Sequence, residues 1–182
     1  FNLMGYGDWN MADLMSFKII GQPGVFMRRE VLEQAGYLDL SYNYLLDVQL
    51  WLRMAAIAEP QYIQGKVWAA ARMHSEAKNM AQAEKFGEEA FTVAKWLCED
   101  PRFYPLSAQI FKKIWAGAHR LNAFYLVEAG KHREALKSYV HMLRYQPIPS
   151  GNTLRRMLYS ALSALGIMRS REWYDRKRKE RY

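Results

Sequence analysis

The spacing of hydrophobic and polar residues divides the chain into two regions. Residues 79–182 place apolar side chains on one face at helical spacing, which predicts a series of amphipathic helices. Residues 1–78 instead have short segments interrupted by glycine and proline. The pattern predicts a mainly α-helical protein with a small β component. We expect residues 1–78 and 79–182 to form two structural parts.

Local signals predict the elements of the first region. In order, we expect a short helix from Asn10 or Asp13 to Lys18, a turn at 21–24, a strand at 25–27, helices at 28–35 and 46–58, and extended segments at 62–63 and 67–72. Gly36 is expected to stop the first of the two longer helices, because glycine readily adopts the left-handed conformation that ends many helices.

The second region predicts an antiparallel helical bundle. Its helices are expected at 83–98, 106–129 and 131–145, then from Asn152 or Thr153 with Leu154, Leu158, Ala161 and Leu165 as the apolar face, and finally in a basic tail. The helices around Gly130 resemble one tetratricopeptide unit, since Gly130, Ala135, Tyr139 and Pro147 match its pattern. One partial unit does not predict a repeat array, which needs about three units.

Positive charge is concentrated at the C-terminus. The net charge is +8, and residues 169–182 carry seven basic and three acidic side chains, a net +4. This tail is interpreted either as a solvated helix or as a contact to an anionic membrane surface. The pattern of interleaved basic and aromatic residues that is typical of single-stranded nucleic-acid binding is absent, so no nucleic-acid partner is expected. A single cysteine excludes a disulfide framework.

The most informative stretch runs from Gln22 to Lys78. It contains an ordered set of residues, which is Gln22, Pro23, Phe26, Arg28, Arg29, Gly36, Leu38, Asp39, Asp47, Leu50, Trp51, Arg53, Arg72 and His74. This set resembles the C-terminal, acceptor-side part of the catalytic domain of family-2 glycosyltransferases, which are inverting enzymes with the GT-A fold. The resemblance covers about a third of the chain and implies a sugar-nucleotide-dependent transferase followed by a helical extension.

Asp47 is the candidate catalytic base. Leu50, Trp51 and Met54 follow it at helical spacing, so it shares an apolar face on which burial would raise the pKa of its carboxyl group. The alternative is an acid that stabilises the first turn of a helix. The resemblance implies that Asp47 deprotonates the acceptor hydroxyl group as that oxygen attacks the anomeric carbon.

Four further residues are candidates for binding. The resemblance implies that His74 contributes to a metal site or touches the diphosphate, and that Arg72 pairs with phosphate. Gln22 and Trp51 would shape the acceptor site, although Trp51 is equally expected as a core aromatic residue. Arg28, Arg29 and Arg53 are expected to be solvated helix residues. No catalytic or metal-binding role is assigned to His119, His132 and His141, because no carboxylate pairs lie near them at metal-ligand spacing.

The resemblance also implies a missing half. The family's nucleotide-binding part, with its Asp-x-Asp motif, comes first, and residues 1–21 cannot supply it. We therefore expect a C-terminal fragment that is inactive alone, with Mn²⁺ or Mg²⁺ needed by the full-length enzyme and no cofactor in the isolated 182 residues. The sequence departs from the family pattern at Leu46, where many members have a second acidic residue. The Gln-x-x-Arg-Trp motif of processive synthases is also absent, which favours an enzyme that adds a single sugar.

The expected partners are a nucleotide-sugar donor and a glycan, lipid-linked or protein acceptor. The expected place is the cytoplasm, with peripheral contact to the inner face of a membrane through the basic tail. The alternative function is a non-enzymatic, tetratricopeptide-like interaction module. Three or more clear helical repeats would favour that alternative, and the sequence shows one partial unit.

Overall fold

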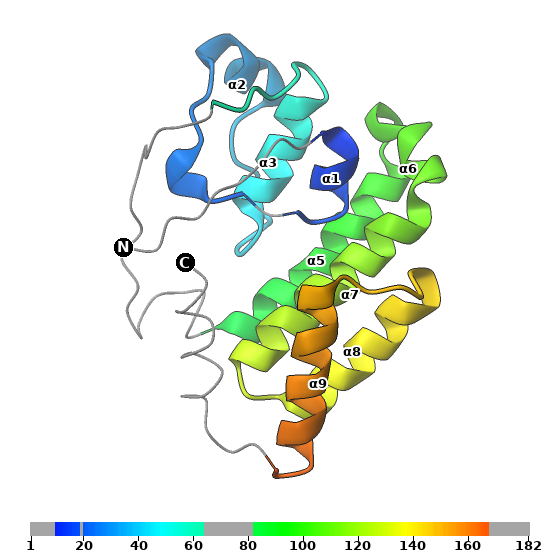
Figure 1. The fold of residues 1–182 in the computed structure, drawn as a ribbon. Helices are drawn as coiled ribbons and strands as arrows, with labels where there is room; N and C mark the ends of the chain where they lie inside the picture. The colour runs from blue at the N-terminus through cyan, green and yellow to red at the C-terminus, as the bar shows by residue number, and fades with distance from the viewer. Residues whose placement is uncertain (1–9, 19, 64–81, 168–182) are drawn as a thin grey trace.

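A computed structural model of the chain describes residues 10–18, 20–63 and 82–167 (Figure 1). Helices dominate these ranges, and no strand occurs within them, so the prediction of a mainly helical protein is confirmed. The strand predicted at 25–27 is wrong. Val25 has extended backbone angles (φ −98°, ψ 122°), but Phe26 is 74% exposed and the described residues provide no strand to pair with this segment. The extended segment predicted at 67–72 lies outside the described residues.

Three short helices precede the bundle. They are α1 (Met11–Met15), α2 (Arg29–Ala35) and α3 (Leu46–Ala55), with the 3₁₀ turn η1 (Gln22–Gly24) between α1 and α2. The Asn10 side chain caps α1 by accepting a 3.0 Å hydrogen bond from the Asp13 N–H group. Of the two predicted starts of α1, Asn10 is therefore the one observed, and the helix ends at Met15 rather than at Lys18. Gly36 ends α2 in the left-handed conformation with φ 83°, as predicted.

The longer helices form the bundle. After α5 (Ala83–Glu99) come the turn η2 (Pro101–Phe103), α6 (Leu106–Gln109), α7 (Phe111–Glu128), α8 (His132–Tyr145) and α9 (Gly151–Ala164). In Figure 1, α5, α7, α8 and α9 lie in sequence order, each antiparallel to the long helix before it. The single helix predicted at 106–129 is interrupted at Ile110, which separates α6 from α7.

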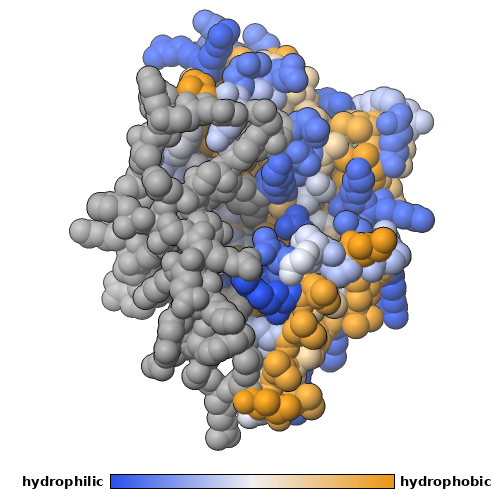
Figure 2. Space-filling view, viewed as in Figure 1, coloured by the Kyte–Doolittle hydropathy of each residue, from blue (hydrophilic) through white to orange (hydrophobic). Residues whose placement is uncertain are grey.

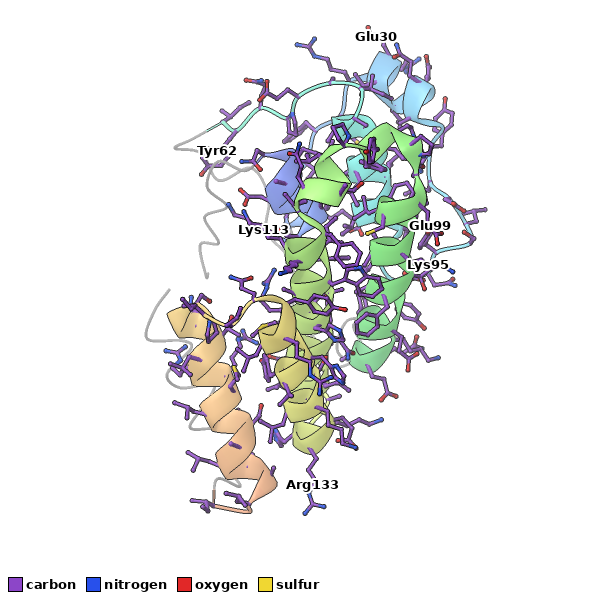
Figure 3. The ribbon with its side chains drawn as sticks, turned by 90° about the vertical axis from the view of Figure 1, so that its right-hand side faces the viewer. Glu30, Tyr62, Lys95, Glu99, Lys113 and Arg133 are labelled. Carbon is purple, nitrogen blue, oxygen red and sulfur yellow. The ribbon has the colours of Figure 1, made fainter. Side chains whose placement is uncertain are left out.

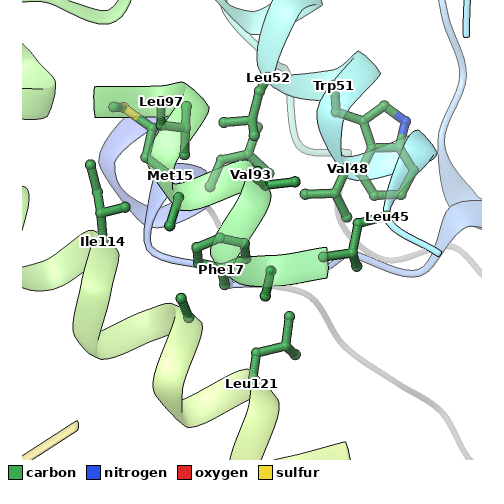
Figure 4. Packing of buried hydrophobic residues seen from close by; sticks show 14 of the residues in the cluster. Met15, Phe17, Leu45, Val48, Trp51, Leu52, Val93, Leu97, Ile114 and Leu121 are labelled. Atoms are coloured by element: carbon green, nitrogen blue, oxygen red, sulfur yellow. The ribbon is translucent and has the colours of Figure 1, made fainter. Parts of the chain in front are cut away.

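The main hydrophobic core joins the two parts of the chain. Side chains from α1 and α3 pack against α5 and α7 (Figure 4), and the core residues labelled there are Met15, Phe17, Leu45, Val48, Trp51, Leu52, Val93, Leu97, Ile114 and Leu121. Residues from both sides of the predicted boundary at 78/79 therefore share one buried cluster. A second, smaller cluster lies between α7, α8 and α9 and is centred on Tyr139 and Met142.

Two glycines permit the close approach of helices. A Cβ atom at Gly117 would lie 2.1 Å from the Ser16 carbonyl oxygen, so glycine is required where the end of α1 meets α7. A Cβ atom at Gly87 would lie 2.7 Å from the Asn122 Cα atom, where α5 crosses α7. These contacts fix α1 and α5 on α7, and thereby position α3, which packs on the same cluster.

Candidate functional site

Asp47 lies in the first turn of α3 and is half-buried. Its Oδ1 atom accepts a 2.8 Å hydrogen bond from the Val48 N–H group. Burial raises the pKa of the Asp47 carboxyl group above its usual value of 3.8, and the nearby Glu89 charge raises it further, although the backbone hydrogen bonds act in the opposite direction. The carboxyl group therefore both stabilises the helix start and is a stronger base than a solvated aspartate.

Glu89 on α5 holds the chain that leads into α3. Its carboxylate accepts hydrogen bonds from the N–H groups of Asn43 (2.8 Å), Tyr44 (2.7 Å) and Leu45 (2.6 Å). Leu45, the residue at the N-cap position of α3, has no capping side chain of its own. Glu89 thus holds the segment that leads into α3 from a distant helix, and it fixes the backbone two residues before Asp47.

Aromatic packing reinforces the same contact. The Tyr44 hydroxyl group donates a 2.6 Å hydrogen bond to Gln82 Oε1, and its ring meets Phe86 edge-on at 5.0 Å between centroids. Phe86 in turn stacks on Tyr125 of α7 at 4.7 Å. Gln82, Phe86 and Glu89 are spaced at i, i+4 and i+7, so they share one face at the start of α5.

Tyr125 on α7 is joined to this contact through its stacking on Phe86. Burial raises the pKa of the Tyr125 hydroxyl group to about 12, and the negative charges of Asp47 and Glu128 contribute. The candidate site is therefore the junction between the start of α3 and α5, with the carboxyl groups of Asp47 and Glu89 and the packed rings of Tyr44, Phe86 and Tyr125.

Arg53 corrects a sequence-based prediction. It was expected to be solvated, but only 8% of its surface is exposed. Its guanidinium group donates to the carbonyl oxygens of Ala35 and Tyr37 at the end of α2, and at 3.0 Å to Gln49 Oε1. Arg53 therefore closes the C-terminal end of α2 and ties it to α3, because a cation satisfies carbonyl groups there that the helix leaves unpaired.

The remaining candidate residues are not all brought to Asp47. Trp51 packs in the main core with 6% of its surface exposed. This position agrees with the alternative that Trp51 is a core aromatic residue. Gln22 is exposed in η1, and no hydrogen bond in the described part of the chain joins its side chain to Asp47. Arg72 and His74 lie outside the described residues.

The junction does not fit a divalent metal ion. No group of three or more His, Cys, Asp or Glu side chains with metal-binding geometry occurs in the described ranges. Of the two carboxylates, Glu89 uses both oxygens to accept backbone N–H groups. Since a hard cation needs several available oxygen ligands, Asp47 and Glu89 do not provide such a site.

Sequence reasoning missed Glu89 and Tyr125. Both residues lie far from Asp47 in the sequence, on other predicted helices, and neither belongs to a recognisable local motif. The one available signal was the shared helical face of Gln82, Phe86 and Glu89, which combines a carboxylate with an aromatic ring and an amide. That signal indicates a contact surface but not its partner.

No protein-family model, curated protein or solved structure matches this chain. Among the described helices, none combines the length and the apolar character needed to cross a bilayer.

Proposed function

We propose that residues 1–182 are the acceptor-side, C-terminal part of an inverting, sugar-nucleotide-dependent glycosyltransferase, with Asp47 as general base. The ordered residues from Gln22 to His74, which resemble family-2 glycosyltransferases, are one support. The observation that carries the proposal is the position of Asp47. It is a half-buried carboxyl group with a raised pKa, in the first turn of α3 and four residues before Trp51.

The proposed reaction uses Asp47 as a proton acceptor. As the acceptor hydroxyl oxygen forms its bond to the anomeric carbon, its proton passes to the Asp47 carboxylate. The bond from the anomeric carbon to the nucleoside diphosphate breaks, the diphosphate leaves with the electron pair, and the configuration at that carbon inverts. A carboxylate whose pKa is raised by burial is a stronger base for this transfer than one in water.

Glu89 supports this role by positioning. Its three backbone hydrogen bonds hold residues 43–45, and its charge contributes to the raised pKa of Asp47. The helical region would then be a part of the catalytic unit, since α5 holds the segment before Asp47 and its Glu89 charge adds to the larger effect of burial on the Asp47 pKa.

The donor belongs to the sequence that precedes residue 1 in this proposal. The described residues do not fit a metal ion, so no step of the transfer is assigned to Mn²⁺ or Mg²⁺. The isolated 182 residues should show no turnover with any nucleotide-sugar. The test is to measure sugar transfer by a protein extended upstream, with and without Asp47→Asn. Transfer that is lost in the variant supports the proposal.

A non-enzymatic interaction module is the second candidate. The antiparallel run of α5, α7, α8 and α9, together with the absence of strands in the described ranges, favours it. The two candidates differ in one property, because only the transferase binds and consumes a nucleotide-sugar. A folded, extended protein that neither binds nor consumes a nucleotide-sugar would favour the interaction module.

A further inference from the structure

Helix α9 exposes a row of leucines to solvent, while its Tyr159 and Met157 pack against the bundle. Leu154, Leu158 and Leu165 are 48%, 57% and 72% exposed. On the opposite side, the polar residues Thr153 and Ser160 are 7% and 0% exposed and face the bundle. An amphipathic helix of a soluble domain ordinarily does the reverse. The leucines, expected from the sequence to be this helix's apolar packing face, instead form a stripe on the surface.

The stripe is visible on the molecular surface. In Figure 2, hydrophobic side chains form a band where Figure 1 places α9. Ile148 before the helix and Ile167 after it are also exposed, at 82% and 68%. A contiguous exposed patch of this kind indicates an interaction surface, whereas singly scattered apolar residues would not.

The part of the sequence that contains the leucine stripe has an excess of basic residues. Residues 131–167 contain six Lys or Arg and one Glu. Two of these cations have acidic partners on other helices, since Lys131 forms an ion pair with Glu84 and Arg156 lies 3.9 Å from Glu128. Residues 169–182 add a further net +4, so residues 1–130 together carry a net charge of −1. Figure 3 shows Arg133 at the end of the molecule formed by α8 and α9, and Glu30 at the other end. The leucine stripe therefore belongs to the part of the sequence that carries the net positive charge.

We propose that the leucine stripe of α9 (Leu154, Leu158 and Leu165) inserts into the surface of a bilayer rich in anionic lipid. Leucines on one line enter the boundary of the acyl chains, while Arg155 and the basic residues of α8 lie at the level of the phosphate groups. Anionic lipid satisfies both observations, since it offers apolar chains and negative charge in one surface. This inference is independent of the transferase proposal.

The test measures vesicle binding by the full 182-residue chain. Vesicles of phosphatidylcholine alone are compared with vesicles that also contain phosphatidylglycerol, by co-sedimentation at low and high salt. The triple variant Leu154→Gln/Leu158→Gln/Leu165→Gln removes the stripe without touching the core. We expect it to bind anionic vesicles at least about tenfold more weakly than the wild type. The control is Leu40→Gln, because Leu40 is 84% exposed in the loop between α2 and α3.

Two further measurements distinguish lipid binding by α9 from lipid binding by the basic tail and from pairing of two chains. A chain that ends at residue 168 should still lose binding when the three leucines are replaced; if only the deletion matters, the tail alone binds lipid and the proposal is wrong. Sedimentation velocity tests a second copy of the chain as the partner. A leucine-dependent dimer, wild-type binding that is equal on neutral vesicles, or no binding at all would each overturn the proposal.

Discussion

The Glu89 carboxylate on α5 accepts a 2.6 Å hydrogen bond from the N–H group of Leu45, the residue immediately before α3. Two further N–H groups, of Asn43 and Tyr44, are held by the same carboxylate. A segment of the first region is therefore fixed by a side chain that follows it by more than forty residues. This contact makes the start of α3 depend on the helical bundle.

Replacing Glu89 by glutamine should destabilise the protein. Glu89→Gln removes the charge and leaves one acceptor oxygen for three N–H groups, so we expect the free energy of unfolding to fall by about 2 kcal/mol. Urea unfolding measures this change. The matched control is Glu88→Gln, since Glu88 is the exposed neighbour on the same helix and should change stability by less than about 0.5 kcal/mol. Equal losses in the two variants would contradict the role given to Glu89.

The same variant should change the titration of Asp47. Because the Glu89 charge raises the pKa of the Asp47 carboxyl group, its removal should lower that pKa toward the ordinary value of 3.8. Carboxyl carbon resonances followed through a pH titration report this shift directly. A loss of stability without a fall in the Asp47 pKa would mean that Glu89 acts only as a structural cap.

Arg53→Lys tests the closure of α2. A lysine has one ammonium group and cannot contact Gln49 and the carbonyl oxygens of Ala35 and Tyr37 together, so it leaves buried acceptors without a donor. We expect the free energy of unfolding to fall by roughly 2 kcal/mol in chemical denaturation. Arg29→Lys is the control, because Arg29 is exposed at the start of α2. If Arg53→Lys leaves the free energy of unfolding unchanged, the guanidinium contacts make no net contribution to stability.

His119 should make the protein sensitive to acid. Burial lowers the pKa of its imidazole group from 6.5 to about 4, and the charge of His141, whose ring stacks on it at 5.2 Å, acts in the same direction. The unfolded chain therefore binds a proton between these values that the folded protein does not. This contribution to stability is present above pH 6.5 and is lost as the pH falls toward 4.

Denaturation midpoints across that pH range measure the effect. The contribution of His119 is at most about 3 kcal/mol, and less where solvent screens the partly exposed ring. His119→Phe keeps an aromatic ring for the contacts with Phe91 and Tyr145 but removes the titration. Its stability should decline less steeply with acid than that of the wild type. Parallel pH profiles for the two proteins would show that another group controls acid sensitivity.

Elements with local signals were predicted well from sequence. Asn10 caps α1 and Gly36 ends α2, because each depends on residues within one turn. Helix α9 begins at Gly151 after the Ser150 cap, one or two residues before the predicted start at Asn152 or Thr153. The positions of Arg53 and Glu89 were not predictable in this way. Both contact backbone groups far away in the chain, and an isolated charged residue on a helix gives no sign of such a partner.

The orientation of α9 shows a second limit of sequence reasoning. The spacing of Leu154, Leu158 and Leu165 predicted an apolar face, and that face exists. The periodicity does not say whether the face meets the protein's own core or another partner, because both remove apolar surface from water. Here the bundle is covered instead by Tyr159 and the small polar residues of the opposite side.

The most direct test of the proposed function is sugar transfer by a protein extended upstream of residue 1. UDP-, GDP- and dTDP-sugars would be offered with Mn²⁺ or Mg²⁺, and turnover compared among the wild type, Asp47→Asn and Glu99→Gln. Glu99 is the control carboxylate, since it is exposed and forms a 3.8 Å ion pair with Lys95 on the surface of α5. We expect turnover to be abolished by Asp47→Asn alone, with the nucleotide still bound. Undiminished turnover in Asp47→Asn, or no nucleotide binding by the folded protein, would contradict the proposed role of Asp47.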